Sequence, residues 1–483
     1  MGITKLFKSR LLYAVPVFLV CGHGYADSTT HLTLTGHITP EEVFSFGYVP
    51  FEVDQDVTSI FVNQTYSFQG AGNSLDLGVF DPRGTGAINA EGGMTGSRGW
   101  SGGFRFNFTI SAEDATPGYN AGPIQAGIWN VVLGPYATNR SGIDWKLDIS
   151  LSHYPKQTLW APSLAPIYKG PLSSQTWLRG DFHMHTIYSD GKYLPNQQIN
   201  NALSRDLDFI FFSDHNTDTS NNNIAKWIPV NASELLICRA IEVTTRQGHW
   251  QAIGLQHAQQ VEWRYTNTTG DTGYADAATQ VLNSGGLVSI NHPFQNCSRC
   301  DWTLDWDHNQ AIEVWNGRFD PLDEVGVQWW QAELGRGKKI TAIGGSDAHS
   351  YPDINGLPTT VVRVEGEKSQ SAIVQAIKRG RAYLVEGPGQ EIDFAVKFGD
   401  KTAHIGDTVP RLECGPDAYA TFTGVGFAGA NACFVGEKGY FSNVSIVDGQ
   451  TIQQPLPGVQ FVLVEVRNSS NVLLGLTNPV YIA

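Results

Sequence analysis

The chain has 483 residues and a formal net charge of −14, with 41% hydrophobic and 16% charged residues. This length exceeds what one ordinary hydrophobic core supports and predicts two or three domains. The acidic balance argues against a basic nucleic-acid-binding face, and it suits a protein that holds divalent cations.

Residues 1–26 have the features of a signal peptide. Lys5, Lys8 and Arg10 precede an apolar run over 11–20, and Ala26 supplies a small residue at the expected cleavage site. The alternative is a membrane anchor, for which the apolar run is short. We therefore expect a periplasmic or secreted protein with no membrane span after cleavage.

Five cysteines remain after the signal peptide, and export permits disulfides between them. Cys414 with Cys433 is a plausible pair, and Cys297 with Cys300 is another candidate. Cys238 would then be free and buried in a strand. The chain has no second C-x-x-C beside the one at 297–300, which argues against a cysteine zinc site.

Residues 27–155 are rich in Thr, Gly and aromatic residues and predict an N-terminal β-sandwich. Alternation over 104–108 predicts one strand, and the run 129–133 predicts another that stops at Gly134 and Pro135. Four prolines in 156–175 indicate a linker. From residue 391 β-character returns, with a clear strand over 461–466, and we expect a small C-terminal β-domain over 391–483.

The region 176–390 alternates between helix and strand patterns. We expect helices over 196–205, 275–282, 322–334 and 369–378, and strands over 209–212, 287–290 and 339–343. Strands that alternate with helices predict a parallel α/β sheet or barrel.

Histidines and carboxylates follow the apolar strands of this middle region. They are His183, His185 and Asp190 in DFHMHTIYSDG, His215 in FIFFSDHN, Glu242 in AIEVTT, His249 in GHW, His292 in SINHPF, and Asp347 and His349 in GGSDAHS. The carboxyl ends of parallel strands meet at one edge, so residues distant in sequence can converge there. His-x-His on one strand end also directs both imidazoles to the same face.

The set carries more weight than any one member. Taken alone, His215 or His249 is as often structural as a ligand, the NHP segment could be a turn, and Asp347 could cap a helix. However, six of the 13 histidines follow predicted strands within this one segment. Imidazole with carboxylate and no thiolate favours Zn, Mn or Fe, and a metal-activated water is then the favoured nucleophile.

With these motifs in view, residues 176–390 resemble the PHP (polymerase and histidinol phosphatase) superfamily. The resemblance implies a central distorted (β/α)7 barrel with two or three metal ions. It implies a first ion on His183, His185, Glu242 and Asp347, a second on Glu242, His249 and His292, and a third on Asp190, His215 and His349. Position 190 is Asp where some members have His, which leaves the strength of the third site open.

The whole chain also resembles one branch of that superfamily, named after bacterial carbaryl hydrolases. The segments SLDLGVFDPRG, GWSGG, DATPGY and VVLGPY resemble the leading β-domain of that branch, and LGLTNPVYIA resembles its tail. This second resemblance concerns architecture more than substrate.

These observations predict a metal-dependent hydrolase that uses a metal-bridged hydroxide, with Glu242 as the bridge and Asp190, His215 or His249 as proton donor. Lys192, Arg246 and Arg318 are candidate contacts for an anionic small-molecule substrate, or else solvated surface charges.

The first functional hypothesis is a phosphoesterase acting on phosphate mono- or diesters, and no nucleic-acid partner is expected. The alternative is a carbamate or aryl-ester hydrolase, in which tryptophans wall a pocket instead of filling a core: Trp250, Trp302, Trp306, Trp315, Trp329 and Trp330. A third hypothesis is a non-catalytic metal-binding surface protein.

Overall fold

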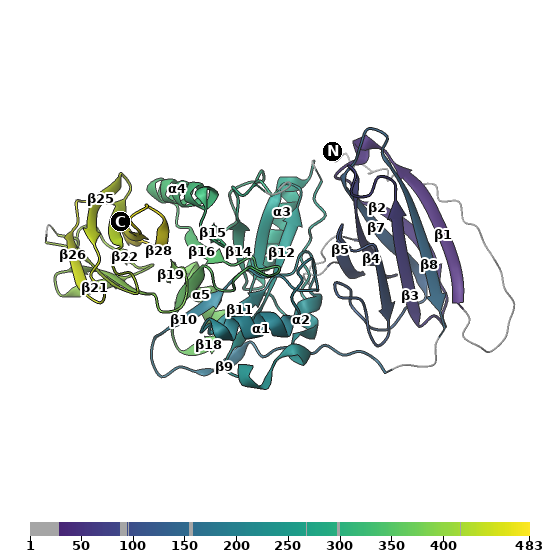
Figure 1. Cartoon of the computed structure of the whole chain (residues 1–483), viewed down its shortest axis with the longest axis horizontal. Helices are drawn as coiled ribbons and strands as arrows, with labels where there is room; N and C mark the ends of the chain where they lie inside the picture. The colour runs from purple at the N-terminus through teal and green to yellow at the C-terminus, as the bar shows by residue number, and fades with distance from the viewer. Residues whose placement is uncertain are drawn as a thin grey trace, which may run out of the picture. The chain divides into compact units, whose positions relative to one another are not determined.

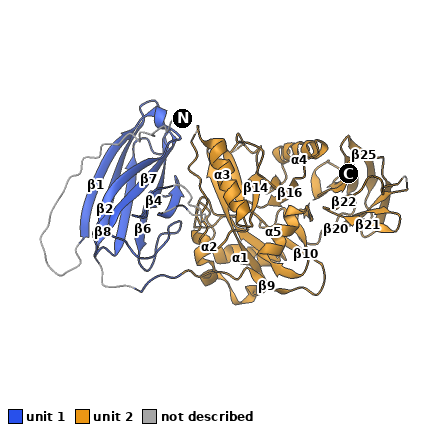
Figure 2. Ribbon diagram, turned by 180° about the vertical axis from the view of Figure 1, so that it is seen from behind, with its two compact units in different colours: residues 1–89, 94–161 blue, residues 90–93, 162–483 orange. Residues whose placement is uncertain are grey.

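The computed structural model describes residues 29–86, 94, 96–153, 158–266, 268–296, 300–415 and 417–483. The expected signal peptide, 1–26, lies outside this range. The chain divides into two compact units, one formed by residues 1–89 and 94–161 and the other by residues 90–93 and 162–483 (Figure 2). No helix in the described ranges has the length and apolar character needed to span a bilayer.

The first unit consists of two four-stranded antiparallel sheets packed on one apolar core. The first sheet has the order β1 (Thr29–Ile38), β8 (Ile143–Ser152), β3 (Ser59–Tyr66) and β6 (Asn107–Ser111). The second has the order β2 (Gly47–Val53), β7 (Gly127–Ala137), β4 (Ser74–Phe80) and β5 (Ser97–Gly102). Strand β8 alternates buried and exposed residues, which is the pattern of a strand with one face on a core.

Two strand predictions in this unit need correction. The strand expected over 104–108 begins only at Asn107, so most of the aromatic alternation precedes β6. The strand expected over 129–133 does not stop at Gly134, because β7 continues to Ala137. Pro135 pairs with Leu75 next to an irregularity in the ladder, a position where a missing N–H is tolerated.

The second unit is built on one long curved sheet (Figure 1). Its first seven strands lie in the order β16 (Thr341–Gly345), β15 (Ala311–Asn316), β14 (Leu287–Asn291), β13 (Gly248–Ile253), β12 (Leu236–Thr245), β11 (Phe209–Phe212) and β10 (Thr176–Asp181). Only β13 runs antiparallel to its neighbours. The carboxyl ends of the other six strands therefore share one edge.

Five α-helices occur in the described residues of this unit: α1 (Pro195–Ser204), α2 (Thr219–Asn223), α3 (Gly270–Asn283), α4 (Pro321–Gly335) and α5 (Gln370–Lys378). Helix α3 packs on β13 and β14, α4 on β15, and α5 on β12 and β17 (Thr359–Val364). Short 3₁₀ helices lie at Pro40–Glu42, Ile224–Trp227 and Val230–Ala232.

The expected closed (β/α)7 barrel is not shown. Strand β10 uses its second edge to pair with antiparallel β17, so no continuous ladder joins β10 to β16. The two ends of the seven-stranded section meet instead through an isolated parallel bridge between Met184 and Ala348. The section is thus curved so that the ends of β10 and β16 come into contact, without a continuous ladder between them.

The same sheet continues past β17 into the C-terminal region. After β17 come β19 (Ala382–Val385), β28 (Leu473–Thr477), β27 (Phe461–Arg467), β24 (Asn431–Gly436) and β25 (Gly439–Ser445). Strand β29 (Val480–Ile482) also pairs with β27, and β22 (Thr408–Val409) pairs with β29. A separate sheet packs on this part in the order β21 (Lys401–His404), β20 (Glu391–Phe398), β23 (Tyr419–Val425) and β26 (Thr451–Pro455). The ladder between β19 and β28 therefore crosses the expected boundary at residue 390.

Two further expectations meet contrary observations. Part of the segment 156–175, expected to be a linker, is structured: β9 (Tyr168–Pro171) pairs with β18 (Glu367–Ser369), and Ala165 is buried. The proposed Cys414–Cys433 disulfide is wrong, because both thiols are free. Cys238 is free and buried in β12. Cys300 is disulfide-bonded, while Cys297 lies outside the described residues.

Candidate metal centre

The nine expected ligands all lie at the edge where the carboxyl ends of the strands meet. His183 and His185 follow β10, His215 follows β11, Glu242 lies near the end of β12, His292 follows β14, and Asp347 and His349 follow β16. His249 is the second residue of β13, and because β13 runs the other way its beginning lies at the same edge. The sheet thus gathers residues separated by more than 160 positions of sequence.

Asp181, the last residue of β10, ties two of these strand ends together. Its buried carboxylate accepts hydrogen bonds from the backbone N–H groups of His183 (3.1 Å), Ser346 (2.9 Å) and Gly356 (2.8 Å). These bonds fix the segment after β10 against the segment after β16. The two segments carry His183 and Asp347.

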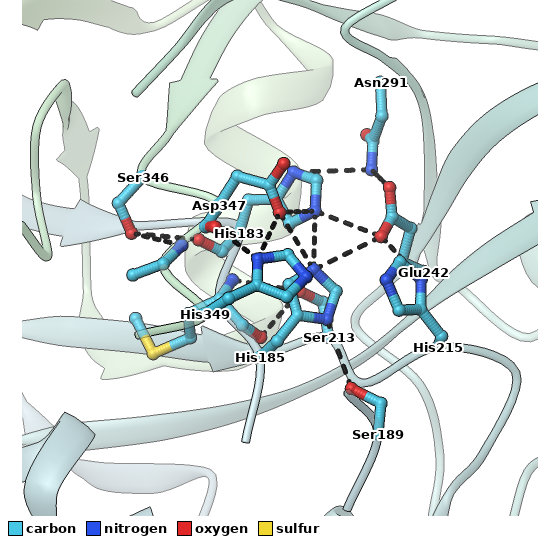
Figure 3. Close-up of polar contacts among 12 residues, drawn as sticks. His183, His185, Ser189, Ser213, His215, Glu242, Asn291, Ser346, Asp347 and His349 are labelled. Carbon is cyan, nitrogen blue, oxygen red and sulfur yellow. Dashed lines mark hydrogen bonds and ion pairs between the residues drawn. The ribbon is translucent and has the colours of Figure 1, made fainter. Parts of the chain in front are cut away.

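The first ligand group contains His183, His185, Glu242 and Asp347, whose side chains turn towards one another (Figure 3). Glu242 Oε2 lies 3.3 Å from Nε2 of both His183 and His185. Asp347 Oδ1 lies 3.2 Å from His183 Nε2 and 3.0 Å from His185 Nε2. Two imidazoles and two carboxylates with converging donor atoms match the ligand number and type of a tetrahedral or five-coordinate divalent ion.

The second group shares Glu242 with the first. Its other oxygen, Oε1, lies 3.1 Å from His292 Nε2 and 3.3 Å from His249 Nδ1. Asn291 also donates to Oε1 from 3.0 Å, which holds the carboxylate in place. The two oxygens of Glu242 thus face different histidines, the arrangement of a carboxylate that bridges two ions.

The third group lies on the more open side of the cluster. Asp190 Oδ1 is 3.3 Å from His349 Nε2 and 3.5 Å from His215 Nε2, and His185 completes the group. His215 Nδ1 also lies 2.9 Å from Glu242 Oε2 and contacts Thr244 Oγ1. The side chains of Asp190 and His349 are 38% and 31% exposed, whereas His183 and His185 are fully buried.

The residues fit bound cations because their buried polar atoms lack hydrogen-bond partners. Asp190 Oδ1, Glu242 Oε2, Asp347 Oδ1, His292 Nδ1 and both ring nitrogens of His249 are buried and make no hydrogen bond in the described structure. Burying such atoms without partners is costly, and a cation would satisfy the oxygens and unprotonated nitrogens together.

Left-handed backbone conformations occur at two of the ligands. His292 has φ +26° and Asp347 has φ +49°, values that non-glycine residues rarely adopt. Each residue lies within two positions of a strand end, where the chain turns sharply and brings the side chain into the cluster. Strain of this kind concentrates at functional sites.

Glu313, in the middle of β15, belongs to the centre although sequence reasoning missed it. Its oxygens lie 3.0 and 3.2 Å from His183 Nδ1, and it accepts hydrogen bonds from His292 N and Asn316 Nδ2, both at 3.1 Å. It is 3% exposed. The signal was present, because the tetrapeptide AIEV around Glu242 recurs at 311–314.

Glu313 faces the ring nitrogen of His183 that points away from the first group. A carboxylate that accepts from Nδ1–H fixes the tautomer and leaves Nε2 free as the metal-binding atom. His185 has a weaker counterpart: its Nδ1 lies 3.4 Å from Ser189 Oγ, and Ser189 donates to Asp214 at 2.7 Å.

Mutual electrostatics shifts the pKa values of the cluster. Burial alone would raise the pKa of Glu242 and of Asp347, but the surrounding histidines hold both well below their usual values. Burial alone would lower the pKa of His183, but nearby carboxylates raise it well above its usual value, and they raise that of His349 to about 9. For His249 burial prevails and the pKa falls. Cations would therefore compete with protons for these sites.

Two cavities open beside the cluster. One, of about 330 Å³, is lined by six of the nine ligands together with Gln295, Asn296 and Asn316. The other, of about 390 Å³, shares Gln295, Asn316 and Asp347 with the first and adds Arg318. Of the three cationic residues expected to contact substrate, Arg318 lines this second cavity, whereas Lys192 and Arg246 line neither.

The six tryptophans that the carbamate or aryl-ester alternative would place in a pocket wall do not line either cavity. Trp250, Trp315 and Trp330 are fully buried, and Trp302 is 7% exposed. Trp306 and Trp329 are partly buried against the core beside α4. In these positions all six are explained by packing.

Two motifs typical of other enzyme classes fall in settings that do not support those classes. Gly99-Trp100-Ser101-Gly102-Gly103 has the spacing of a serine nucleophile motif, but Ser101 is fully buried in β5 and bonded to Tyr119 Oη at 2.8 Å. Gly424-Val425-Gly426-Phe427-Ala428-Gly429 has the spacing of a dinucleotide-binding loop, but it joins strands β23 and β24 and precedes no helix.

No family model matches the chain, and no curated protein matches it either. Eleven chains of solved structures resemble parts of it. A two-domain protein of Bacteroides vulgatus, described as containing a predicted PHP-like metal-dependent phosphoesterase, is 18% identical with a TM-score of 0.36, over 68% of this chain and 100% of its own.

Two others are smaller. An amidohydrolase of Chromobacterium violaceum with bound sulfate and no metal is 16% identical with a TM-score of 0.27, over 36% of this chain and 89% of its own. A protein of Bifidobacterium adolescentis, described as a predicted metal-dependent phosphoesterase, is 18% identical with a TM-score of 0.25, over 37% of this chain and 90% of its own. At these TM-scores a functional proposal has to rest on the geometry of the site itself.

Proposed function

We propose that this protein is a metal-dependent phosphoesterase of the PHP type that acts on small phosphate mono- or diesters. The observation that carries the proposal is the sharing of ligands between groups. Glu242 belongs to the first and second groups, His185 to the first and third, and the donor atoms of each group lie within 4.8 Å of one another. Ions spaced by shared ligands are the arrangement used to clamp the attacking and leaving oxygens of a phosphoryl group.

Each residue of the centre has a role in this proposal. His183, His185, Glu242 and Asp347 would hold the first ion, His249 and His292 the second together with Glu242, and the third group a further ion. Bound divalent ions would supply Lewis acidity, lowering the pKa of a water and stabilising charge on the substrate. We leave the ions as Zn, Mn or Fe, because imidazole and carboxylate suit all three.

The chain itself supplies groups for binding and proton transfer. Arg318 lines the cavity beside Asp347 and offers N–H donors to an anionic substrate. The carboxamide of Asn316 also lines this cavity, but its N–H groups already donate to Glu313 and Asp347. His349 holds a proton at neutral pH in the metal-free cluster, because Asp190 and Asp347 raise its pKa to about 9 against the effect of burial. When it does not bind an ion, His349 is well placed to protonate a leaving group.

The carbamate or aryl-ester alternative lacks a specific supporting observation. Such a substrate would need apolar or aromatic walls beside the metals, and the six candidate tryptophans lie in cores instead. A polar cavity with Arg318 suits a phosphoryl group better.

We also propose that the protein is exported to the periplasm or the medium. The charge and apolar pattern of residues 1–26 supports this, and so does the disulfide at Cys300, since disulfides persist in oxidising compartments.

A three-substrate comparison tests the function. Metal-loaded protein is assayed with nitrophenyl phosphate, bis-nitrophenyl phosphate and naphthyl methylcarbamate. We expect turnover of a phosphate ester that disappears in the double variant His183→Ala, His185→Ala and persists in His257→Ala, whose imidazole is exposed and outside the cluster. Turnover of the carbamate alone would replace the proposal with its alternative. Metal binding with no turnover would favour the non-catalytic reading.

A further inference from the structure

A basic cavity lies at the end of β16 opposite to the metal ligands. It has a volume of about 350 Å³ and includes Thr341, the first residue of β16, whereas Asp347 follows the last. Four of its ten lining residues are Lys or Arg, whereas the whole chain has 32 such residues among 483. Asp407 is the one acidic residue among the ten. Positive charge is thus concentrated here in a chain whose formal net charge is −14.

We propose that this cavity binds a small oxyanion with at least two negative charges, such as orthophosphate or a small phosphorylated metabolite. The proposal does not depend on the activity of the metal centre.

The cations around the cavity are incompletely neutralised. The guanidinium of Arg379 makes no hydrogen bond or ion pair with any residue in the described part of the chain. Arg381 reaches Glu365 at 3.0 Å outside the cavity, but its Nη2 is 3.7 Å from Asp407 Oδ1, too far for a hydrogen bond. Lys339 Nζ donates to the neutral hydroxyl of Thr408 at 3.0 Å and lies 4.8 Å from the centre of the Tyr481 ring. Lys378 Nζ donates to the carbonyl oxygen of Gly285 at 3.2 Å.

A fifth cation, Arg363, does not line the cavity but approaches Asp407, which does. It is 3% exposed, its Nη2 is 3.8 Å from the same oxygen of Asp407, and its Nε makes no hydrogen bond. One carboxylate therefore stands between Arg363 and Arg381 without a short bond to either. Burial lowers the pKa of Arg363, and the neighbouring charge of Arg381 adds to this effect. The charged form of Arg363 is therefore disfavoured here, and a bound anion would stabilise it.

Helix electrostatics does not account for the whole cluster. Lys378 and Arg379 lie at the carboxyl end of α5, where cations interact favourably with the helix dipole. Lys339 comes from the segment before β16, and Arg381 and Arg363 belong to the region of β19 and β17. The chain brings cations from separate elements to one place.

Two glycines are among the residues that line the cavity, and their backbone segments approach each other closely. Gly380 has φ +71° and Gly406 has φ +88°, and a Cβ on Gly406 would lie 2.2 Å from the carbonyl oxygen of Arg379. Four cationic residues and two glycines thus line a cavity of about 350 Å³. This shape suits a small anion with several acceptor oxygens, whereas a nucleic acid needs an extended basic stripe.

Calorimetric titration with inorganic phosphate tests the proposal. It is done on the metal-loaded full chain and again after chelation, because phosphate can also bind at the metal centre. We expect saturable binding that survives chelation. Arg379→Ala or Lys339→Ala should weaken it about tenfold or more, the effect of losing one charge-assisted hydrogen bond, and Arg379→Glu should abolish it.

Arg336→Ala is the matched control, because Arg336 is 67% exposed, pairs with Glu333 and does not line the cavity. Its phosphate affinity should equal that of the unaltered chain, and circular dichroism melts establish that each variant is folded. Absence of saturable binding after chelation overturns the proposal, and so does binding that Arg379→Glu leaves intact. Binding of heparin that tightens with polymer length, without phosphate binding, would show a polyanion surface instead and would also overturn it.

Discussion

The carboxylate of Glu313 lies 3.0 Å from Nδ1 of His183, on the side of the imidazole that faces away from Glu242 and Asp347. Both side chains are buried. The pair orients a ligand of the first ion from behind, and Glu313 also accepts a hydrogen bond from the backbone of His292, a ligand of the second.

Replacing Glu313 by Gln should weaken binding of the first ion by about 10–100-fold, the usual cost of losing such a supporting carboxylate. Cobalt or zinc titration measures the affinity, and ¹⁵N NMR of the histidines reports the His183 tautomer, which should lose its preference for Nδ1–H. Glu333→Gln is the control. Glu333 is an acid on α4 that is 5% exposed and pairs with Arg336 and Lys338. Loss of one whole ion at unchanged tautomer would instead show that Glu313 is itself a ligand.

The number of ions lost should depend on which ligand is removed. Glu242→Ala removes the carboxylate shared by two groups and should cost both of those ions, whereas His349→Ala should cost only the third. Mass spectrometric metal counts on dialysed protein give the stoichiometry directly. Equal losses in the two variants would contradict the bridging role of Glu242.

The pH dependence of stability should change sign with metal. His349 has a pKa of about 9 in the folded metal-free protein against an ordinary value of 6.5. Its contribution to stability is complete below pH 6.5 and is lost as the pH rises to 9. Urea unfolding of chelated protein should therefore show falling stability over this window, with a flatter profile in His349→Gln. The stability of metal-loaded protein should instead rise as the pH increases over this window, because fewer protons then compete with the ions for the ligands. A chelated protein that becomes more stable towards pH 9 would refute this assignment.

Gly345 permits the close approach of β16 to the segment after β10. A Cβ there would lie 2.4 Å from His183 Cβ and 2.8 Å from His183 N, and neither atom is the end of a flexible side chain. Gly345→Ala should cost about 1–3 kcal/mol and lower metal affinity. Denaturant unfolding and metal titration measure both effects. Gly335→Ala, where the nearest atom is 3.8 Å from the added Cβ, should leave both unchanged or slightly raise stability.

Local sequence patterns predicted the elements that depend on local forces. The helix expected over 196–205 is α1, the apolar run 209–212 is β11, and the strand expected over 461–466 lies within β27. Helix α3 starts at Gly270, several residues before the expected 275, because its first turn carries no apolar periodicity. The pairing of β10 with β17 and of β19 with β28 joins distant segments, and no local pattern encodes such partners.

The candidate site was predictable where residue type and position agreed. Histidines after apolar strands are conspicuous, and the structure brings all nine expected ligands to one edge. Glu313 was missed because a single acid inside an apolar strand does not stand out from the strand itself. Lys192 and Arg246 lie close in sequence to ligands, but neither lines the two cavities beside the centre. Nearness in sequence is a poor guide to where a long side chain points.

Asn478 helps to hold the strand that positions Asp347 in the metal centre. Its buried carboxamide accepts from Ala342 N at 2.8 Å and donates to the carbonyl oxygens of Ala342 and Ala382 at 2.9 and 3.0 Å, which fastens β16 to β19. The position of β16, the strand that leads to Asp347, thus depends in part on a residue far along the chain. Replacing Asn478 by Ala would keep every expected ligand and the pairing of β16 with β15, but it would remove the bonds that join β16 to β19. We therefore expect this variant to bind metal more weakly, although the altered residue lies outside the cluster.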